Sequence, residues 1–368
     1  MQTIKAVVVD DTIVYRKIVG DVLKAIPGVE VVGTANNGKI ALSKIKTLKP
    51  DIITLDIEMP EVNGIEVLQE LRNMDQPPIA VMLSTLTQEG SEMTIRALEL
   101  GAFDFVPKPE DGKMADNMLK VKAAIEPIVK AIKRRKGGVS AFGKTGTFTK
   151  PVTTKPVRPK TAPPKVAVPR KPRIRSKSEI IGIGISTGGP NALTRMIPMF
   201  PANFKAPILI VQHMPPMFTA SLANSLNNKA KLEVKEAAEG DVIEAGKVYI
   251  APGGKQMKIV AGADGLTRKI KITDDPPENS CKPAVDYLFR SIAQHYVGRS
   301  TGVIMTGMGS DGTKGLAQMK KNGSTVIAQD EDSCTVFGMP KEPIESGLAD
   351  VIAPLDKIAD EILKTVTL

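Results

Sequence analysis

Short apolar runs alternate with stretches of helical period in the first third of the chain. The apolar runs read KAVVVD, VEVVGTA, DIITLD, IAVMLS and DFVPK, and amphipathic stretches such as VYRKIVGDVLKAI and EVLQELRNM lie between them. Strands that alternate with helices in this way pair side by side in a parallel sheet. The pattern predicts a (βα)5 domain over residues 1–125, with a last helix that could reach residue 136.

Three apolar runs in the second half each end in a different polar residue. IIGIGIS ends at Ser186, PILIVQH ends at His213, and TGVIMTGMGSD ends at Asp311. Buried parallel strands read as continuous apolar runs, and their carboxyl ends lie along one edge of the sheet, where open α/β folds assemble their sites. We therefore predict a doubly wound, mostly parallel α/β domain over residues 179–368, in which these three side chains could converge.

Basic residues are concentrated between the two predicted domains. The chain carries a net charge of +10, but residues 133–177 alone contain fifteen Lys or Arg and no Asp or Glu. This segment is rich in Pro and Lys and lacks hydrophobic periodicity, so residues 137–178 are predicted to form an extended, self-repelling, disordered linker. Its charge fits either a solvated spacer or a docking surface for an anionic partner, and the sequence leaves both open.

The composition is that of a globular protein, and the 368 residues are enough for two domains. No apolar stretch approaches the roughly 20 residues of a membrane span, and the first residues lead into a predicted strand rather than a signal peptide. The two cysteines, Cys281 and Cys334, are too few for a disulfide framework and lack the spacing of a zinc site. We therefore expect a cytoplasmic protein without structural zinc and without direct membrane insertion.

Polar residues follow the predicted strands of the first domain. Asp10 and Asp11 come after the first strand, Asp56 after the third, Ser84 after the fourth and Lys108 after the fifth. Any one of these acids could simply cap the helix that follows it. Three carboxylates at one edge of a sheet repel one another and favour an oxygen-coordinated cation such as Mg²⁺, and a carboxylate beside that ion can accept a phosphoryl group. Together they indicate a phosphorylatable aspartate.

These residues also carry a resemblance to a known family. Asp10-Asp11, the LDIEMP block around Asp56, Ser84 and Lys108-Pro109 resemble the receiver domains of two-component response regulators over residues 1 to about 125. The resemblance implies that Asp56 accepts phosphate from the phosphohistidine of a partner kinase, with Mg²⁺ as the cofactor. It also implies Mg²⁺ ligands at Asp10, Asp11, Asp56 and the backbone carbonyl of Glu58, and switch positions at Ser84, Phe105 and Lys108.

The glycine-rich turn GIGISTGG at residues 182–189 admits two interpretations. As G-x-G-x-x-x-G after a strand, it could hold the pyrophosphate of a dinucleotide at a helix N-terminus; as G-I-S-T-G, it exposes Ser186 as a nucleophile. The dinucleotide interpretation expects an acid at the end of the next strand, where the chain has Gln212-His213. His213 fits a general base better than His295, which lies in a helical pattern and is expected to pack or face solvent.

The acid that would orient His213 is harder to choose. Asp311 follows a strand and a glycine-rich turn whose backbone N–H groups could bind an oxyanion, whereas Asp330 follows the strand GSTVIAQD. The residues by themselves favour Asp311 and leave Asp330 open. The chain order Ser, His, Asp differs from the Ser, Asp, His order of the α/β-hydrolases, so a standard esterase of that family is not expected.

Four motifs of the second half carry a second resemblance. ISTGGP, QHMPPMFT, YIAPGG and MTGMGSDG resemble the catalytic domain of the protein-glutamate methylesterases of bacterial chemotaxis, a family that joins a receiver to this domain in the same order. The resemblance favours Asp311 over Asp330 as the acid that orients His213. It implies Ser186 as nucleophile, His213 as general base and Asp311 as the residue that orients it, with Thr187 and the backbone N–H of Met308 at the site.

The resemblance also implies a function. We expect phosphorylation-regulated hydrolysis of glutamyl γ-methyl esters on methyl-accepting chemotaxis receptors through an acyl-enzyme, without a cofactor for the ester hydrolysis. Deamidation of receptor glutamines would use the same type of intermediate. The implied partners are these receptors and a chemotaxis histidine kinase, with the protein a monomer at receptor arrays.

Three other classes of function compete with this one. A DNA-binding output is disfavoured because the second half has no helix-turn-helix or winged-helix pattern, so no nucleic-acid partner is expected. The hypothesis of an NAD(P)-dependent enzyme is supported only by the glycine-rich turn. The main alternative is a non-catalytic adaptor that docks on receptors under receiver control.

Overall fold

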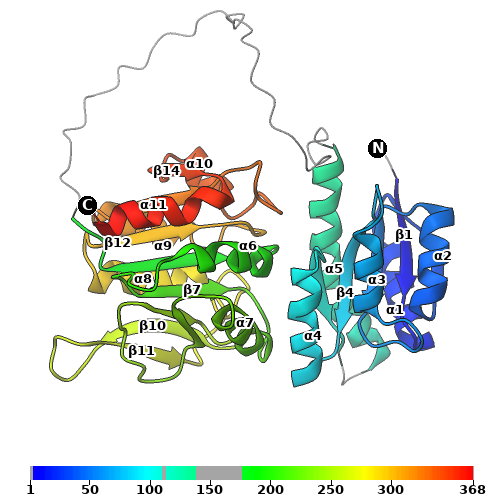
Figure 1. Ribbon diagram of the computed structural model, residues 1–368, viewed down its shortest axis with the longest axis horizontal. Helices are drawn as coiled ribbons and strands as arrows, with labels where there is room; N and C mark the ends of the chain where they lie inside the picture. The colour runs from blue at the N-terminus through cyan, green and yellow to red at the C-terminus, as the bar shows by residue number, and fades with distance from the viewer. Residues whose placement is uncertain (1–2, 110–112, 138–175, 368) are drawn as a thin grey trace, which may run out of the picture.

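Figure 1 shows the computed structural model, which describes residues 3–109, 113–137 and 176–367. These residues form two α/β units, one from each half of the chain. The basic linker predicted over residues 137–178 falls, apart from its ends, outside the described residues.

The first unit is built on a five-stranded parallel sheet with the order β2-β1-β3-β4-β5. The predicted apolar runs supply its strands: β1 (Ile4–Val9), β2 (Val29–Ala35), β3 (Ile52–Asp56), β4 (Ile79–Ser84) and β5 (Asp104–Pro107). Helices cover both faces of the sheet, so the strands in its middle are apolar throughout rather than alternating. The predicted (βα)5 fold is confirmed.

Five helices of the first unit divide between the two faces of its sheet. They are α1 (Ile13–Lys24), α2 (Gly38–Leu48), α3 (Gly64–Leu71), α4 (Gln88–Glu99) and α5 (Met114–Gly137). Successive side chains of a strand point to opposite faces. Val8 of β1 accordingly packs with α1 and α5, and Val7 packs in the cluster that includes α2, α3 and α4.

The second unit is built on a seven-stranded sheet with the order β14-β13-β12-β6-β7-β9-β8, in which every pair is parallel. Its strands are β6 (Ile180–Ile185), β7 (Ile208–Gln212), β8 (Glu233–Glu236), β9 (Lys247–Ile250), β12 (Ser300–Ile304), β13 (Thr325–Gln329) and β14 (Val351–Ala353). A separate antiparallel hairpin, β10 (Gln256–Ala261) and β11 (Arg268–Thr273), interrupts the βα alternation.

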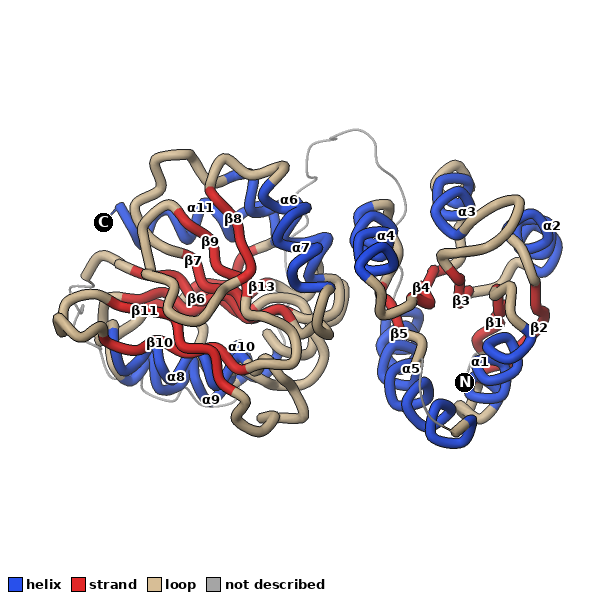
Figure 2. Tube along the Cα trace, turned by 90° about the horizontal axis from the view of Figure 1, so that it is seen from below, coloured by secondary structure: helices blue, strands red, loops and turns tan. Residues whose placement is uncertain are grey.

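The helices of the second unit cover both faces of its sheet (Figure 2). They are α6 (Gly189–Met196), the 3-10 helix η1 (Ile197–Met199), α7 (Phe218–Asn227), α8 (Val285–His295), α9 (Thr313–Lys321), α10 (Lys341–Glu345) and α11 (Leu355–Thr367). Helices α6, α7 and α11 share one apolar cluster, and α8 and α9 share another on the opposite face. Strand β6 lies between β7 and β12, so the strand order reverses there, which is where open α/β folds place their ligands.

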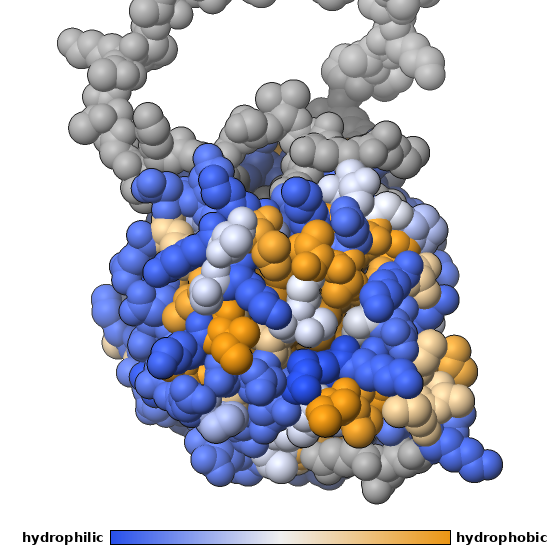
Figure 3. Space-filling view, turned by 90° about the vertical axis from the view of Figure 1, so that its right-hand side faces the viewer, coloured by the Kyte–Doolittle hydropathy of each residue, from blue (hydrophilic) through white to orange (hydrophobic). Residues whose placement is uncertain are grey.

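The two units meet through α4 on one side and α6 and α7 on the other, as Figures 1 and 2 both show. The hydroxyl oxygens of Ser91 and Ser221 lie 2.6 Å apart across this contact, and Glu99 forms an ion pair with Lys229. Figure 3 shows the side of the first unit turned away from the second, where apolar side chains form small patches among polar ones. Among the described helices, none is long and apolar enough to cross a lipid bilayer.

The close packing of β6 against the start of α8 yields a stability prediction. A Cβ atom added to Gly184 would lie 2.4 Å from Cγ1 of Val285, which is fully buried. We expect Gly184→Ala to lower the unfolding free energy of the second unit by about 1–3 kcal/mol, because the β-branched Val285 has no free rotamer to yield. Urea unfolding followed by circular dichroism measures this.

A double-mutant cycle provides the control for this prediction. In a Val285→Ala background the added methyl group has room, so Gly184→Ala should cost less there than in the wild-type protein. The same cost in both backgrounds would contradict the packing explanation.

Candidate functional site

The polar residues at the carboxyl edge of the first sheet meet around one ammonium group. Lys108 Nζ lies 2.8 Å from Oδ2 of Asp10 and 2.7 Å from Oδ2 of Asp56. Both carboxylates are buried, and the ring of Tyr15 has its centroid 5.0 Å from the same ammonium. The ends of β1, β3 and β5 are thereby held together by a single cation.

The electrostatics of this cluster favour a divalent cation. Burial raises the pKa of Asp56 to about 7; the neighbouring Lys108 opposes the rise, and Asp10 adds to it. Burial by itself lowers the pKa of Lys108, but Asp56 and Asp10 outweigh it and the pKa is raised. Asp10, Asp11 and Asp56 each present a carboxylate oxygen within 4.8 Å of the others. Three hard oxygen donors of this kind fit Mg²⁺.

Two of the three predicted switch positions, Ser84 and Phe105, face different parts of the molecule. Ser84 is buried; its hydroxyl accepts a hydrogen bond from the Thr94 hydroxyl at 2.6 Å and lies 3.2 Å from the carbonyl oxygen of Gly90, at the start of α4. The ring of Phe105 stacks on Phe218 of α7, with centroids 4.5 Å apart. One switch position is therefore tied to α4, and the other reaches the second unit directly.

Ser186 lies on the tight turn between β6 and α6. Its N–H donates to the carbonyl of Thr306 at 3.0 Å, and its carbonyl accepts from the side-chain amide of Gln212 at 3.0 Å. Gly188 follows at a φ of 78°, and a Cβ added to Gly307 would lie 2.7 Å from Cβ of Ser186. Glycine is therefore required at both positions for the turn to pass this close to the loop after β12.

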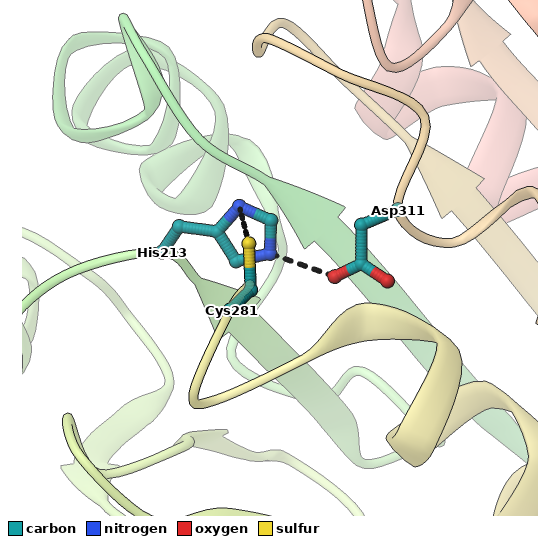
Figure 4. Close-up of side chains that lie close together, drawn as sticks. All are labelled: His213, Cys281 and Asp311. Atoms are coloured by element: carbon teal, nitrogen blue, oxygen red, sulfur yellow. Dashed lines mark hydrogen bonds and ion pairs between the residues drawn. The ribbon is translucent and has the colours of Figure 1, made fainter. Parts of the chain in front are cut away.

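His213 and Asp311 come together from two different strand ends. Nε2 of His213 lies 2.9 Å from Oδ2 of Asp311, and Figure 4 shows the imidazole pointing at the carboxylate. Asp330, the other candidate acid, accepts hydrogen bonds from the N–H and hydroxyl of its neighbour Ser333 at 3.0 and 2.6 Å. His295 lies at the C-terminal end of α8. The partner of His213 is thus Asp311.

The Asp311 carboxylate is buried and held at both oxygens by the N-terminus of α8. Oδ2 accepts from the N–H of Val285 at 2.7 Å, and Oδ1 accepts from the N–H of Asp286 at 3.1 Å and from the side-chain amide of Asn279 at 2.8 Å. Burial opposes ionisation of Asp311, but His213 and these hydrogen bonds outweigh it and lower its pKa. The positive end of the helix dipole acts in the same direction.

The hydrogen bond to Asp311 fixes which nitrogen of His213 can accept a proton. With Nε2–H donating to the carboxylate, Nδ1 carries the free lone pair of the neutral ring. Burial lowers the pKa of His213, but the bonds to Asp311 and Cys281 and their charges outweigh burial and raise it to about 9. Asp311 therefore favours the protonated form of the imidazole, which is the form that the ring takes when it accepts a proton.

Cys281 is a site residue that the sequence did not reveal. Its Sγ lies 3.6 Å from Nδ1 of His213, a residue 68 positions earlier in the chain (Figure 4). Within the described residues no hydrogen bond joins the Ser186 hydroxyl to His213, although both side chains line the same cavity. The thiol thus occupies the side of the imidazole that a serine nucleophile would approach.

The glycine-rich loop after β12 is held from two sides. The N–H of Gly307 donates to the carbonyl of Val336 at 3.0 Å, and its carbonyl accepts from the N–H of Met339 at 2.9 Å. The Met308 side chain packs against an apolar cluster of the first unit that includes Phe103. Among the described residues, the N–H of Met308 has no hydrogen-bond partner, so it is available to an oxyanion.

A cavity of about 240 Å³, including space open to solvent, lies at the contact between the two units. Its lining comes from both: Asp104 and Phe105 of β5, and Ser186, Thr187, Gln212 and His213 of the second unit. The Thr187 side chain forms a hydrogen bond with the Asp104 carboxylate, and burial raises the pKa of Asp104 to about 6 despite that bond and the Phe105 N–H. The first unit therefore covers the candidate site.

The fold and the two polar clusters define a class of protein: a response regulator whose output domain is an enzyme of the parallel α/β type. Residues 6–120 match the family model of the response regulator receiver domain, and residues 181–362 match that of the CheB methylesterase. The chain belongs to the CheB methylesterase family.

Relatives support this assignment over the whole chain. A protein-glutamate methylesterase/protein-glutamine glutaminase of Desulfotalea psychrophila is 55% identical over 368 residues, which is 100% of both chains. Its counterpart in Bacillus subtilis is 42% identical and covers 99% of this chain and 98% of its own. The crystal structure of the Thermotoga maritima CheB methylesterase catalytic domain, 44% identical, covers 51% of this chain and 99% of its own with a TM-score of 0.50. The predicted family and fold class are confirmed.

The geometry around His213 yields a prediction that needs no substrate. We expect NMR titration to place the pKa of His213 near 9 and that of His295 below its ordinary value, because burial and the nearby Arg268 lower the latter. Asp311→Asn removes the carboxylate and should lower the pKa of His213 by more than about one unit. Asp330→Asn is the matched control and should leave it unchanged. A pKa of His213 that does not respond to Asp311→Asn would contradict the pairing.

Proposed function

We propose that this protein hydrolyses glutamyl γ-methyl esters on chemotaxis receptors and that phosphorylation of its receiver domain controls the reaction. The observation that carries the proposal is the pairing of His213 with the buried Asp311, with His213 and Ser186 lining one cavity, in a chain of the CheB methylesterase family. Relatives that match over the full chain are named for methylesterase and glutaminase activity. Deamidation of receptor glutamines is part of the same proposal because it uses the same tetrahedral intermediate.

We assign each residue a role in acyl transfer that this geometry supports. Ser186 Oγ attacks the ester carbonyl while Nδ1 of His213 takes its proton, since Nε2 is bonded to Asp311. Asp311 stabilises the imidazolium that forms, and the free N–H of Met308 is positioned in the loop beside Ser186 to bind the oxyanion. His213 then protonates the departing methanol, and water cleaves the acyl-enzyme with His213 again as the base. Thr187 would contact the substrate once Asp104 leaves it.

The docked arrangement opposes this reaction by covering the site. Asp104 and Phe105 line the cavity, so a side chain carried by another protein cannot approach Ser186. Movement of the receiver would expose the site to substrate and water. The family inference that the unphosphorylated receiver inhibits the catalytic domain therefore has a physical basis in this chain.

Phosphorylation of Asp56 is proposed to act through α4 and β5. Asp10, Asp11, Asp56 and the Glu58 carbonyl would hold Mg²⁺, which neutralises the charge of the incoming phosphoryl group. A phosphoryl oxygen would draw the Ser84 hydroxyl away from Gly90 and Thr94 and engage Lys108. Because these contacts fix the start of α4, and α4 packs on α6 and α7, their loss would weaken the contact between the units.

The kinase is expected to reach Asp56 from the side of the receiver that faces away from the catalytic unit. Figure 3 shows small apolar patches on that side, and Ile13 and Val14 at the start of α1 are exposed. These residues follow Asp10, Asp11 and Thr12 in the chain, so they lie near the phosphorylation site. We propose this surface for the chemotaxis histidine kinase and place the protein at receptor arrays through its substrate.

The first test of the proposed function is methanol release from methyl-labelled receptor membranes. We expect Ser186→Ala to reduce release by more than about a hundredfold, because the nucleophile is lost. Mg²⁺ with a small-molecule phosphodonor should raise release by the wild-type protein but not by Asp56→Asn. Wild-type release that persists in Ser186→Ala would contradict the assigned nucleophile, and no release by any form would favour the receptor-docking adaptor.

A second test addresses the covering of the site by β5. Phe105→Ala removes the ring that stacks on Phe218, and the loss of an aromatic pair and its buried area should raise phosphodonor-independent methanol release about tenfold. Ile40→Ala, a truncation of an exposed apolar residue of α2, is the matched control and should have no effect. Equal basal rates for the wild-type protein and Phe105→Ala would contradict inhibition through this contact.

A further inference from the structure

Cys281 places a soft sulfur ligand beside the imidazole nitrogen that the proposed mechanism uses. Sγ of Cys281 lies 3.6 Å from Nδ1 of His213, while Nε2 of the same ring is bonded to Asp311. The side chains of Cys281 and His213 are both partly exposed, which leaves a route for a small ion from solvent. The three residues form one of two groups of metal-ligating side chains found among the described residues.

The distance between these two atoms suits one class of ion. Zn²⁺ binds imidazole nitrogen at about 2.0–2.1 Å and thiolate sulfur at about 2.3 Å in tetrahedral geometry, which separates the two ligand atoms by roughly 3.5–3.6 Å. The observed 3.6 Å therefore matches a pair of ligands that share one zinc ion.

The surroundings of His213 also match those of a zinc-binding histidine. Metal-bound histidines almost always donate their other ring N–H to a carboxylate or carbonyl, which fixes the tautomer and strengthens the ligand. Asp311 accepts that bond here and is itself held by Val285, Asp286 and Asn279, so Nδ1 is oriented as a ligand.

The loop that carries Cys281 holds the thiol in place. The backbone N–H and carbonyl of Cys281 both pair with Glu278, whose carboxylate forms two hydrogen bonds with the guanidinium of Arg290. Asn279 and Ser280, between them, both have positive φ angles, 50° and 63°. A pre-formed pair of ligands loses little conformational entropy when it binds an ion.

We propose that Cys281 Sγ and His213 Nδ1 form a binding site for a thiophilic divalent cation such as Zn²⁺, with water completing the coordination, and that occupation of this site inhibits the enzyme. The ion displaces any proton on Nδ1 to solvent and takes the lone pair that would accept the proton of Ser186, so the bound form has no general base. The three acids of the receiver are oxygen ligands and select Mg²⁺ instead, which keeps the two cations at separate sites.

Cys334 provides an internal comparison. Burial raises the pKa of its thiol, and Asp330 and Glu331 raise it further, so the thiolate that a metal requires is disfavoured there. The other cluster of metal-ligating side chains contains no cysteine. Among the described residues, zinc binding through sulfur should therefore depend on Cys281 alone.

The binding itself is tested with Co²⁺ as a spectroscopic probe on the full-length protein, in the presence of excess Mg²⁺ to occupy the receiver. We expect a sulfur-to-cobalt charge-transfer absorption in the wild-type protein, in Cys334→Ser and in Ser186→Ala, and its loss in Cys281→Ser and Cys281→Ala. The band should also disappear when Zn²⁺ is added. Absence of the band from the wild-type protein, or its persistence in both Cys281 variants, would overturn the site.

The inhibitory consequence rests on the proposed function and is measured separately. The rate of methanol release by each protein is compared with its own rate without zinc. The Zn²⁺ concentration that halves the rate should be at least tenfold higher for Cys281→Ser than for the wild-type protein or Cys334→Ser. Equal sensitivity of all three would overturn inhibition through Cys281. The cobalt spectrum requires neither substrate nor turnover. It therefore tests the metal site even if the protein proves not to be an esterase.

Discussion

One buried carboxylate organises the candidate catalytic centre. A charge removed from water must be compensated, and Asp311 is compensated by two backbone N–H groups of α8, by Asn279 and by His213. These partners come from separate segments of the chain, so the carboxylate ties the ends of β7 and β12, the start of α8 and the preceding loop to one point. The orientation of the imidazole, and with it the position of the base, follows from this arrangement.

The contact between the two units lies directly beside this candidate catalytic centre. β5 of the receiver brings Asp104 to Thr187 and Phe105 to Phe218, immediately beside Ser186 and the His213 ring. The residues that would receive the substrate are therefore the ones that hold the receiver. Under the proposed function, docking of the receiver and binding of a substrate would compete for one surface, which would couple a phosphoryl group at Asp56 to access at Ser186.

Much of this architecture could be predicted from the sequence because parallel strands have a strong local signature. Apolar runs such as those ending at Ser186 and His213 became β6 and β7, and their shared carboxyl edge explains why residues far apart in the chain meet. The choice between Asp311 and Asp330 was harder, since both follow a buried strand. It depends on where the N-terminus of α8 lies, and no local pattern places Val285 and Asp286 beside one acid rather than the other.

Two residues at the site had no signal in the sequence. Cys281 contacts His213 across 68 positions, and the spacing of the two cysteines gave no reason to pair either with a histidine. Asp104 reaches Thr187 across the contact between the units, which exists only after both have folded. The hairpin of β10 and β11 was likewise not anticipated, because it adds an antiparallel element to an otherwise regular βα alternation.

The central claim is that Ser186 is a nucleophile activated by His213 and covered by the unphosphorylated receiver. Covalent labelling of Ser186 by a fluorophosphonate reagent, followed over time in the intact protein, tests it most directly. The account predicts slow labelling that accelerates when Mg²⁺ and a phosphodonor are added, and no labelling of the site in Ser186→Ala. A labelling rate that is the same with and without the phosphodonor, or label that attaches elsewhere in the second unit, would contradict it.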